Sequence, residues 1–156
     1  MSTQVLSEQG FQAWLGLLRG HAALVRKLNA ELIADHGITI NDYDVMAQLV
    51  RAPDRKMRRV DLARSVVLSA SGITRLLDGL ERDGWVCKAS CTSDGRITYA
   101  VLTDEGLAKY RAARATHLAS VRELFADRYS CDELEQLAEL LGRLDGTPLA
   151  LSLIHI

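Results

Sequence analysis

The chain has 156 residues, of which 48% are hydrophobic, 25% are charged and two are proline. This length and composition allow one domain with a real core, and they exclude a disordered or collagen-like chain. The sequence has no apolar run of about 18 residues, and its N-terminus lacks the basic start and apolar stretch of a secretory signal. A cytoplasmic protein is therefore expected.

The net charge of −1 hides an uneven distribution along the chain. Residues 1–50 carry 3 basic and 5 acidic side chains (−2), residues 51–96 carry 10 and 6 (+4), and residues 97–156 carry 6 and 9 (−3). A basic middle between acidic ends is typical of a nucleic-acid-binding protein, because attraction to backbone phosphates supplies most non-specific affinity. An ordinary solvated surface is the alternative that charge alone leaves open.

Three cysteines, Cys87, Cys91 and Cys131, are an odd number in a chain without a secretory signal. This number favours reduced thiols over a disulfide framework. The spacing of Cys87 and Cys91 resembles half of a zinc site, but only His117 follows within thirty residues. Neither a metal nor a cofactor is expected.

The first third of the chain has helical periodicity. Apolar residues three and four positions apart predict a long helix over about 11–33, which Gly37 ends. Thr39 is a suitable N-cap for a second helix, which Pro53 closes.

A short helix is expected over about 60–66, and Ser69 is placed to cap the helix that follows it. The second of these helices has the inward stripe Ile73, Leu76, Leu77 and Leu80, and Gly84 ends it. Residues 85–88 and 97–102 then form two β-prone runs around the polar segment SCTSDG, which predicts a hairpin.

The last third of the chain is again helical in its pattern. Thr103 starts a helix that is expected to run to about Tyr129. Ser130 and Glu133 form a capping box for a final helix with leucines at heptad-like spacing, which ends near Gly146.

This order of elements predicts a mainly α fold with a small β-hairpin wing, in which a winged helix-turn-helix lies between terminal helices. The helix of residues 70–83 leaves a small-polar and arginine surface outside its apolar stripe, formed by Ser71, Thr74, Arg75, Asp78 and Arg82. Such a surface fits a DNA major groove. The alternative is a merely solvent-facing side of an amphipathic helix.

Three segments of the chain resemble the MarR (multiple antibiotic resistance regulator) family of dimeric transcription factors. They are YDVMAQL at 43–49, DLARSVVLSASGITRLLDGLERDGWV at 61–86 and the wing signature DGRITYAVLTDEG at 94–106. The resemblance covers residues 11–145 and implies a homodimer whose recognition helices and wings bind a pseudo-palindromic operator. The apolar stripes of the terminal helices are larger than one small winged module can cover, which also indicates a dimer.

On this basis residues 1–146 are expected to form a single MarR-type domain. The winged helix-turn-helix spans about 39–103, and the dimerisation helices span about 8–36 and 104–146. Residues 147–156 contain LSLIHI, which fits no element of the family, and they are expected to be a disordered tail or an artefact.

The resemblance also implies the residues that contact DNA. Ser69, Ser71, Thr74 and Arg75 match recognition-helix positions, and Asp94 and Arg96 match the wing pair. An arginine at a hairpin tip suits the narrow minor groove, and the nearby carboxylate is expected to hold its guanidinium in register. Gly95 stands where most relatives have a second arginine. The alternative is a surface ion pair of little consequence.

A finer resemblance is to the urate-responsive subgroup of the family. Trp14, Asp44 and Arg75 match three positions of its ligand site, and Lys88 stands where that subgroup has an arginine. The resemblance implies a small anionic aromatic ligand, urate-like or phenolic, that releases DNA. His21 lies on the same side as Trp14 and is a further candidate. The alternative for Trp14 and Asp44 is packing and hydrogen bonding within the fold, and the alternative for His21 is a histidine with satisfied hydrogen bonds at the dimer interface.

The sequence thus predicts a ligand-responsive transcriptional regulator that acts as a repressor and is not an enzyme. No Ser-His-Asp arrangement, phosphate loop or HExxH motif occurs. One alternative is a redox-responsive repressor that uses Cys87 or Cys91, although Cys87 is expected to pack under the wing. The other alternative is a helical protein-interaction module that does not bind DNA.

Overall fold

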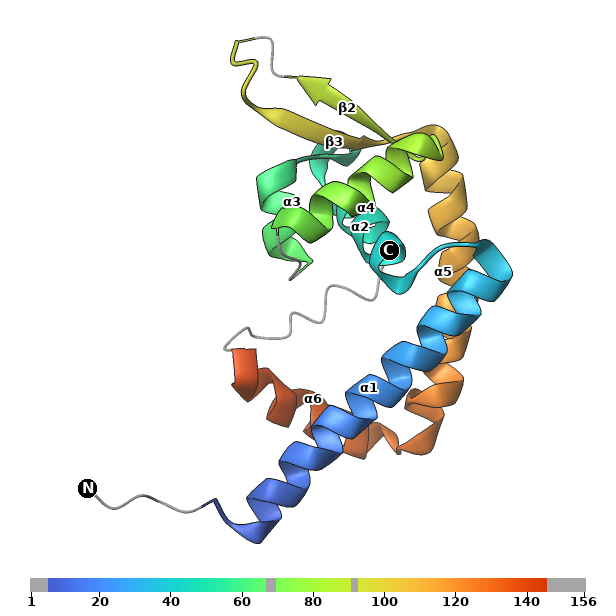
Figure 1. Cartoon of the computed structure of the whole chain (residues 1–156). Coiled ribbons are helices and arrows are strands. Elements are labelled where there is room, and N and C mark those ends of the chain that lie inside the picture. Colours follow the sequence, from blue (N-terminus) through green and yellow to red (C-terminus); the bar gives the residue numbers. More distant parts are fainter. Residues whose placement is uncertain (1–5, 67–69, 91–92, 146–156) are drawn as a thin grey trace, which may run out of the picture. The chain divides into compact units, whose positions relative to one another are not determined.

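The computed structural model describes residues 6–66, 70–90 and 93–145 (Figure 1). Its elements are α1 (Glu8–His36), α2 (Ile40–Arg51), the 3-10 turn η1 (Pro53–Arg55), β1 (Lys56–Arg58), α3 (Arg59–Ser65), α4 (Ala70–Arg82), β2 (Val86–Ser90), β3 (Thr98–Leu102), α5 (Asp104–Leu124), the 3-10 turn η2 (Ala126–Arg128) and α6 (Cys131–Asp145). The chain divides into two compact units, residues 1–118 and 119–156. Ser69, Cys91 and the expected tail at 147–156 lie outside the described residues.

The predicted fold class, mainly α with a small β wing, is confirmed. None of the described helices is long and apolar enough to cross a bilayer.

The predicted boundaries between α1 and α2 are confirmed, and local hydrogen bonds explain them. Gly37 has the left-handed conformation (φ 67°) that glycine adopts easily, and its amide donates to the Ile33 carbonyl, which ends α1. Thr39 begins α2 as part of a capping box with Asp42. The Ile40 amide donates to Asn29 Oδ1 at 2.9 Å, so the start of α2 lies beside α1 at residue 29.

The predicted helix over 103–129 is shorter in the structure. The helix α5 ends at Leu124, because Phe125 leaves helical geometry with φ −128° and ψ −66° and the 3-10 turn η2 follows. The capping box that opens α6 is confirmed, since the Ser130 amide donates to Glu133 Oε2 at 2.8 Å and the Glu133 amide donates to Ser130 Oγ at 3.2 Å. The expected end of α6 at Gly146 lies outside the described residues.

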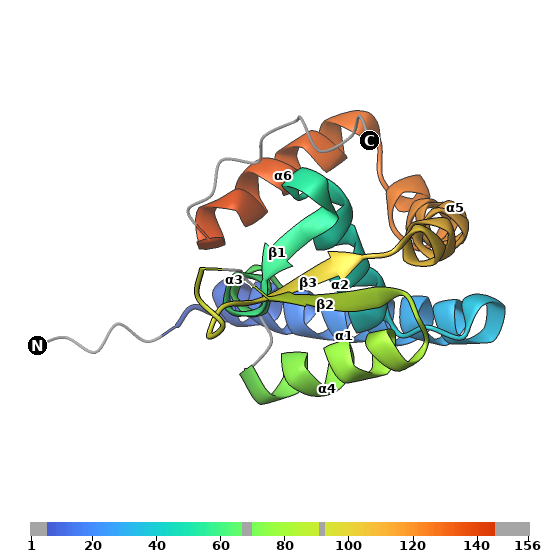
Figure 2. The same ribbon diagram turned by 90° about the horizontal axis from the view of Figure 1, so that it is seen from above.

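The wing is a three-stranded antiparallel sheet with strand order β1-β3-β2. Strands β2 and β3 form the predicted hairpin, with Lys88 opposite Ala100. Strand β1 was not predicted, because its sequence Lys-Met-Arg is too short to show the alternation of a strand. It pairs with β3 from the far side and places Met57 opposite Ala100. Figure 2 shows α4 running alongside β2.

The core of the first unit is built around α2. Five α2 side chains are buried, and the end of α1, helices α3 and α4 and the sheet pack around them. The largest fully buried side chains are Leu32, Ile38, Met46, Leu49, Leu62, Leu77, Leu80, Leu102, Val45 and Val86. The predicted inward residues of α4 thus belong to this core, which fixes the opposite side of α4 as its outer surface.

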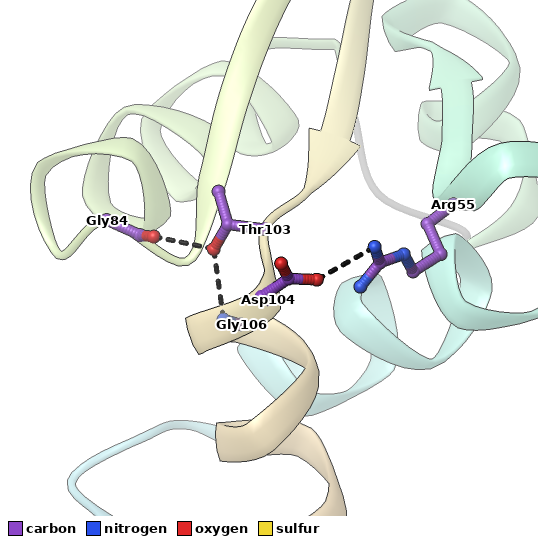
Figure 3. A network of polar contacts seen from close by, with 5 residues as sticks. All are labelled: Arg55, Gly84, Thr103, Asp104 and Gly106. Atoms are coloured by element: carbon purple, nitrogen blue, oxygen red, sulfur yellow. Dashed lines mark hydrogen bonds and ion pairs between the residues drawn. The ribbon is translucent and has the colours of Figure 1, made fainter.

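The end of α4, both strands of the hairpin and the start of α5 meet at one junction (Figure 3). Gly84, with φ 77°, closes α4 in a Schellman motif, in which its amide donates to the Glu81 carbonyl and the next amide donates to the Leu80 carbonyl. The Thr103 hydroxyl donates to the Gly84 carbonyl at 2.7 Å and accepts from the Gly106 amide at 3.0 Å. The Thr103 amide donates to the Trp85 carbonyl at 3.0 Å.

Gly106 is required at this junction for reasons of space. A Cβ atom at position 106 would overlap the Trp85 carbonyl and would lie 2.8 Å from Leu102 Cδ1. A backbone carbonyl held by a hydrogen bond cannot move aside as a flexible side chain does. The first turn of α5 therefore packs directly on the backbone of the wing.

We expect Gly106→Ala to destabilise the fold by about 1–3 kcal/mol, or more if the junction cannot relax, because it overpacks a fixed contact. Gly79→Ala in α4 is the matched control, since an added Cβ there meets nothing within 4 Å. That control should be neutral or stabilising by up to about 1 kcal/mol, because alanine favours helix. Urea unfolding of both variants measures the difference, and equal stability of the two would contradict the packing argument.

Candidate nucleic-acid interface

The outer surface of α4 carries the predicted recognition residues. Ile73, Leu77 and Leu80 are buried, and the opposite side of the helix exposes Ser71, Thr74 and Arg75. Ser71 and Thr74 also make polar contacts within the protein. The amphipathic pattern of α4 thus exposes the predicted recognition side chains to solvent. Ser69, the fourth of these residues, lies outside the described residues.

The predicted wing pair is joined through the backbone and not through the guanidinium. Asp94 Oδ1 accepts a hydrogen bond from the Arg96 backbone amide at 3.0 Å, and the Ile97 amide donates to the Asp94 carbonyl at 3.1 Å. The contact of Asp94 with the Arg96 guanidinium is not formed in this structure, and the role of the pair in DNA binding stays a prediction. Asp94 shapes the turn, as aspartate commonly does. The exposed Arg96 guanidinium makes no ion pair within the part of the chain that the structure describes.

Lys88, predicted to contact a ligand, is engaged in ion pairs with the recognition helix. Its Nζ atom lies 3.1 Å from Glu81 Oε2 and 3.8 Å from Asp78 Oδ1. Arg59 at the start of α3 reaches the same Asp78 oxygen at 3.8 Å. These four side chains connect α3, α4 and β2, and we refer to them as the α4 charge network.

The remaining predicted ligand residues form no bond with Lys88 in the part of the chain that the structure describes. Trp14 and His21 are exposed on α1. The helix α2 begins beside Asn29, which follows Trp14 by fifteen residues. This separation corresponds to about 22 Å along the helix axis. No hydrogen bond or ion pair of the described residues joins Trp14, Asp44, Arg75 and Lys88 to one another.

Asp44 instead belongs to a polar and aromatic cluster between α2 and α5. The Tyr43 ring stacks on Tyr110 with centroids 5.3 Å apart, and it contacts the His117 ring at 4.4 Å. Asp44 is exposed at the surface, but partial desolvation raises the pKa of its carboxyl, against the opposing effects of Arg51 and His117. Burial lowers the pKa of His117, although Asp44 opposes this shift. Both shifts favour the uncharged forms of the two groups.

His117 and Tyr110 were not predicted as members of this cluster. They lie seven residues apart and therefore on one side of α5, which is a signal that could have linked them. The His117 Nδ1 atom is buried and has no hydrogen-bond partner within the described residues. The same end of α5 is tied to α1, because His36 Nε2 and Thr116 Oγ1 form a hydrogen bond of 2.7 Å.

The cysteines are placed differently from the expectation. Cys87 is exposed, so the expectation that it packs under the wing is wrong. Strand alternation explains the result: Val86 is buried and Lys88 points to α4, so Cys87 lies on the opposite face of the sheet. Cys131 is also exposed. Within the described residues no three His, Cys, Asp or Glu side chains form a group that could hold a metal.

Helices α3 and α4 followed by a β hairpin, with exposed arginines on α4 and on the hairpin, define a winged helix-turn-helix protein. Comparison with known proteins gives its family, because residues 36–97 match the model described as the MarR family. AbsC, a MarR family transcriptional regulator from Streptomyces coelicolor, is 30% identical with a TM-score of 0.85, over 92% of this chain and 97% of AbsC. The chain therefore belongs to the MarR family and is a DNA-binding transcriptional regulator, not an enzyme.

Two further relatives are informative. Sco3205, a MarR family regulator from Streptomyces coelicolor whose structure contains DNA, is 25% identical with a TM-score of 0.88, over 97% of this chain and 94% of Sco3205. The homoprotocatechuate degradative operon repressor of Escherichia coli is 27% identical over 110 residues, which are 70% of this chain and 72% of the repressor.

Proposed function

We propose that the protein is a homodimeric repressor that binds a pseudo-palindromic operator through α4 and the wing. Ser69, Ser71, Thr74 and Arg75 would contact the major groove, and Arg96 would enter the minor groove from a turn shaped by Asp94. The observation that carries the proposal is the pair of exposed arginines, Arg75 on the outer side of α4 and Arg96 in the wing. The likeness to Sco3205, whose structure contains DNA, supports it.

The two arginines have different roles in this proposal. A guanidinium on a helix in the major groove reads base edges, because its fork matches the two acceptors of guanine. A guanidinium in the minor groove responds to groove width and potential more than to base identity. Arg75 would therefore determine sequence preference, and Arg96 would add affinity.

The test uses a duplex that the wild-type protein selects from a random library. We expect Arg96→Ala to weaken binding to this selected duplex by about 1–3 kcal/mol and to leave the melting temperature of the protein unchanged. Arg75→Ala should instead reduce the ratio of affinities for the selected and a scrambled duplex. Arg111→Ala, an exposed arginine of α5, is the control for a lost charge. Fluorescence anisotropy measures all three, and Arg96→Ala binding as tightly as Arg111→Ala would contradict the role of the wing.

The dimer rests on exposed apolar side chains in both units. Those on or next to α1 are Leu6, Phe11, Trp14, Leu17, Leu18 and Ile33, and those on α6 are Leu140, Leu141 and Leu144. Exposed apolar side chains in such number mark interaction sites in soluble proteins. We propose that α1, α5 and α6 of two copies cover these surfaces, so that residues 1–146 act as one MarR-type domain with a winged module over about 39–103.

We expect Leu141→Asp to give monomeric or unfolded protein, because an unpaired charge in a dry interface costs several kcal/mol. Gln136→Asp adds the same side chain at an exposed polar position of α6 and should leave the dimer intact. Sedimentation equilibrium at micromolar concentration distinguishes the two. A stable dimer of Leu141→Asp would place the interface elsewhere.

The ligand is proposed to be a small anionic aromatic compound, urate-like or phenolic, whose binding weakens DNA binding. Trp14, His21, Asp44, Arg75 and Lys88 are its candidate contacts. The exposed indole of Trp14 is available for stacking on a ring, and the cations of Arg75 and Lys88 would bind its charge. The likeness to a repressor of a homoprotocatechuate degradative operon supports an aromatic compound. An anion that binds Lys88 must compete with Glu81 and Asp78.

We expect urate to quench the fluorescence of Trp14 and to lower affinity for the selected duplex. Linkage requires that DNA weaken urate binding by the same factor. Trp14→Phe and Asp44→Ala should impair this response more than they impair DNA binding without ligand. The titration is carried out in a Trp85→Phe variant, because Trp85, whose ring lies beneath the Lys109 ammonium, also fluoresces. If purines, salicylates and phenolic acids at millimolar concentration change neither signal, the ligand proposal is wrong.

A further inference from the structure

The recognition helix carries two carboxylates on the side that faces the wing. Asp78 and Glu81 lie three residues apart on α4, and both pair with Lys88 of β2. Glu81 is the more enclosed, with a side chain 19% exposed, compared with 50% for Asp78. One Glu81 oxygen, Oε2, holds Lys88 at 3.1 Å, and the other is buried without a hydrogen-bond partner within the described residues.

The register of the sheet explains why Lys88 reaches α4. Lys88 lies opposite Ala100 on β3, and Ala100 lies opposite Met57 on β1. Residues directly opposite each other point to the same side of a sheet, and here that side contains the buried Ala100. Lys88 is therefore a charged side chain on the core-facing side of the wing, and its ammonium group extends to Glu81 at the edge of the core.

Electrostatics alone would disfavour these carboxylates. A protein that binds DNA gains affinity from cations near phosphates and loses it from anions on the same surface. A partly exposed ion pair also contributes little to folding stability. The pair also has a geometric consequence, because it connects the last turns of α4 to β2, the strand that leads to the wing turn with Arg96.

We propose that Glu81 is a positioning residue for DNA recognition. Its ion pair with Lys88, supported by Asp78 and Arg59, sets the angle between α4 and the wing, so that Arg75 and Arg96 engage one duplex together. The inference rests on the proposed DNA interface. It assigns Glu81 and Lys88 to specificity although neither needs to contact DNA.

For Glu81→Gln, a positioning role and simple electrostatics predict opposite changes in affinity for the selected duplex. Removal of a negative charge near DNA should tighten binding to every duplex if charge alone matters. If Glu81 positions the wing, binding to the selected duplex weakens by about two- to fivefold, the range expected for one partly exposed ion pair. Binding to a scrambled duplex tightens slightly in the same variant, so the ratio of the two affinities falls.

Asp83→Asn is the matched control. It removes the same charge two residues away, from an exposed side chain without an ion pair in the described residues. It should tighten binding to both duplexes and leave their ratio unchanged. Glu81→Asp keeps the charge but shortens the side chain by one methylene, and it should lower the ratio as Glu81→Gln does.

A double-mutant cycle completes the test. Lys88→Met alone should lower the ratio, and Glu81→Gln combined with Lys88→Met should lower it no further, because the two residues act as one pair. Thermal unfolding of each variant reports folding separately.

The outcomes are distinct. Tighter binding of Glu81→Gln to both duplexes, as in Asp83→Asn, or additive effects of Glu81→Gln and Lys88→Met would overturn the proposal and leave the DNA interface standing. Failure of the wild-type protein to select any duplex would remove the interface, and the positioning role with it.

Discussion

The contact on which the DNA-binding module depends is the one between the Trp85 carbonyl and the first turn of α5. This carbonyl accepts from the Thr103 amide, and Gly106 leaves it the space to do so. Gly84, which ends α4, is held by the Thr103 hydroxyl. The end of the recognition helix, both ends of the hairpin and the start of α5 are thus fixed within a few residues of one another. A rotation of α5 must move α4 and the wing together, because close-packed contacts transmit displacement and do not absorb it.

The same helix carries Tyr110 and His117, whose rings contact Tyr43 of α2. His117 follows Gly106 by eleven residues, or about 16 Å along the helix axis. The cluster includes Asp44, and the nearby His36–Thr116 hydrogen bond ties α1 to α5. A ligand that contacts Asp44 would therefore act on the same rigid element that ends at the DNA-binding junction. It would shift DNA affinity only by as much as it prefers one arrangement of that element.

The sequence predicts those parts of the fold that local chemistry decides. Gly37, Thr39 and the Ser130–Glu133 box act over three or four residues, so their roles can be read from spacing. Strand β1 could not be predicted in this way, because three residues are too few to show a period and its partners on β3 lie 41 to 45 residues further along the chain. The end of α5 was placed too late, since nothing in the residues around Phe125 breaks a helix as proline does.

The candidate site shows the same division. Exposure of Arg75 follows from the amphipathic pattern of its own helix. The partners of Lys88 and of Asp44 depend on the packing of separate elements, and spacing along the chain does not encode it. Family resemblance assigned both residues to one ligand site, whereas the structure gives Lys88 a partner on α4 and gives Asp44 a neighbour on α5.

The basic surplus in the middle of the chain also has a specific position. Residues 51–59 carry five basic and one acidic side chain, and residues 60–96 carry five of each, so the whole surplus of +4 lies between the end of α2 and the start of α3. Arg55 pairs with Asp104 at 2.9 Å, and the Lys56 ammonium lies over the Tyr99 ring. Arg58 is exposed and makes no ion pair in the described residues. Over residues 70–82, α4 itself has two basic and two acidic side chains and no net charge. In the proposed complex, general attraction to phosphates and selective contact with bases would therefore be divided between neighbouring elements, since a helix without net charge gains little from phosphate attraction and must bind through the fit of individual side chains.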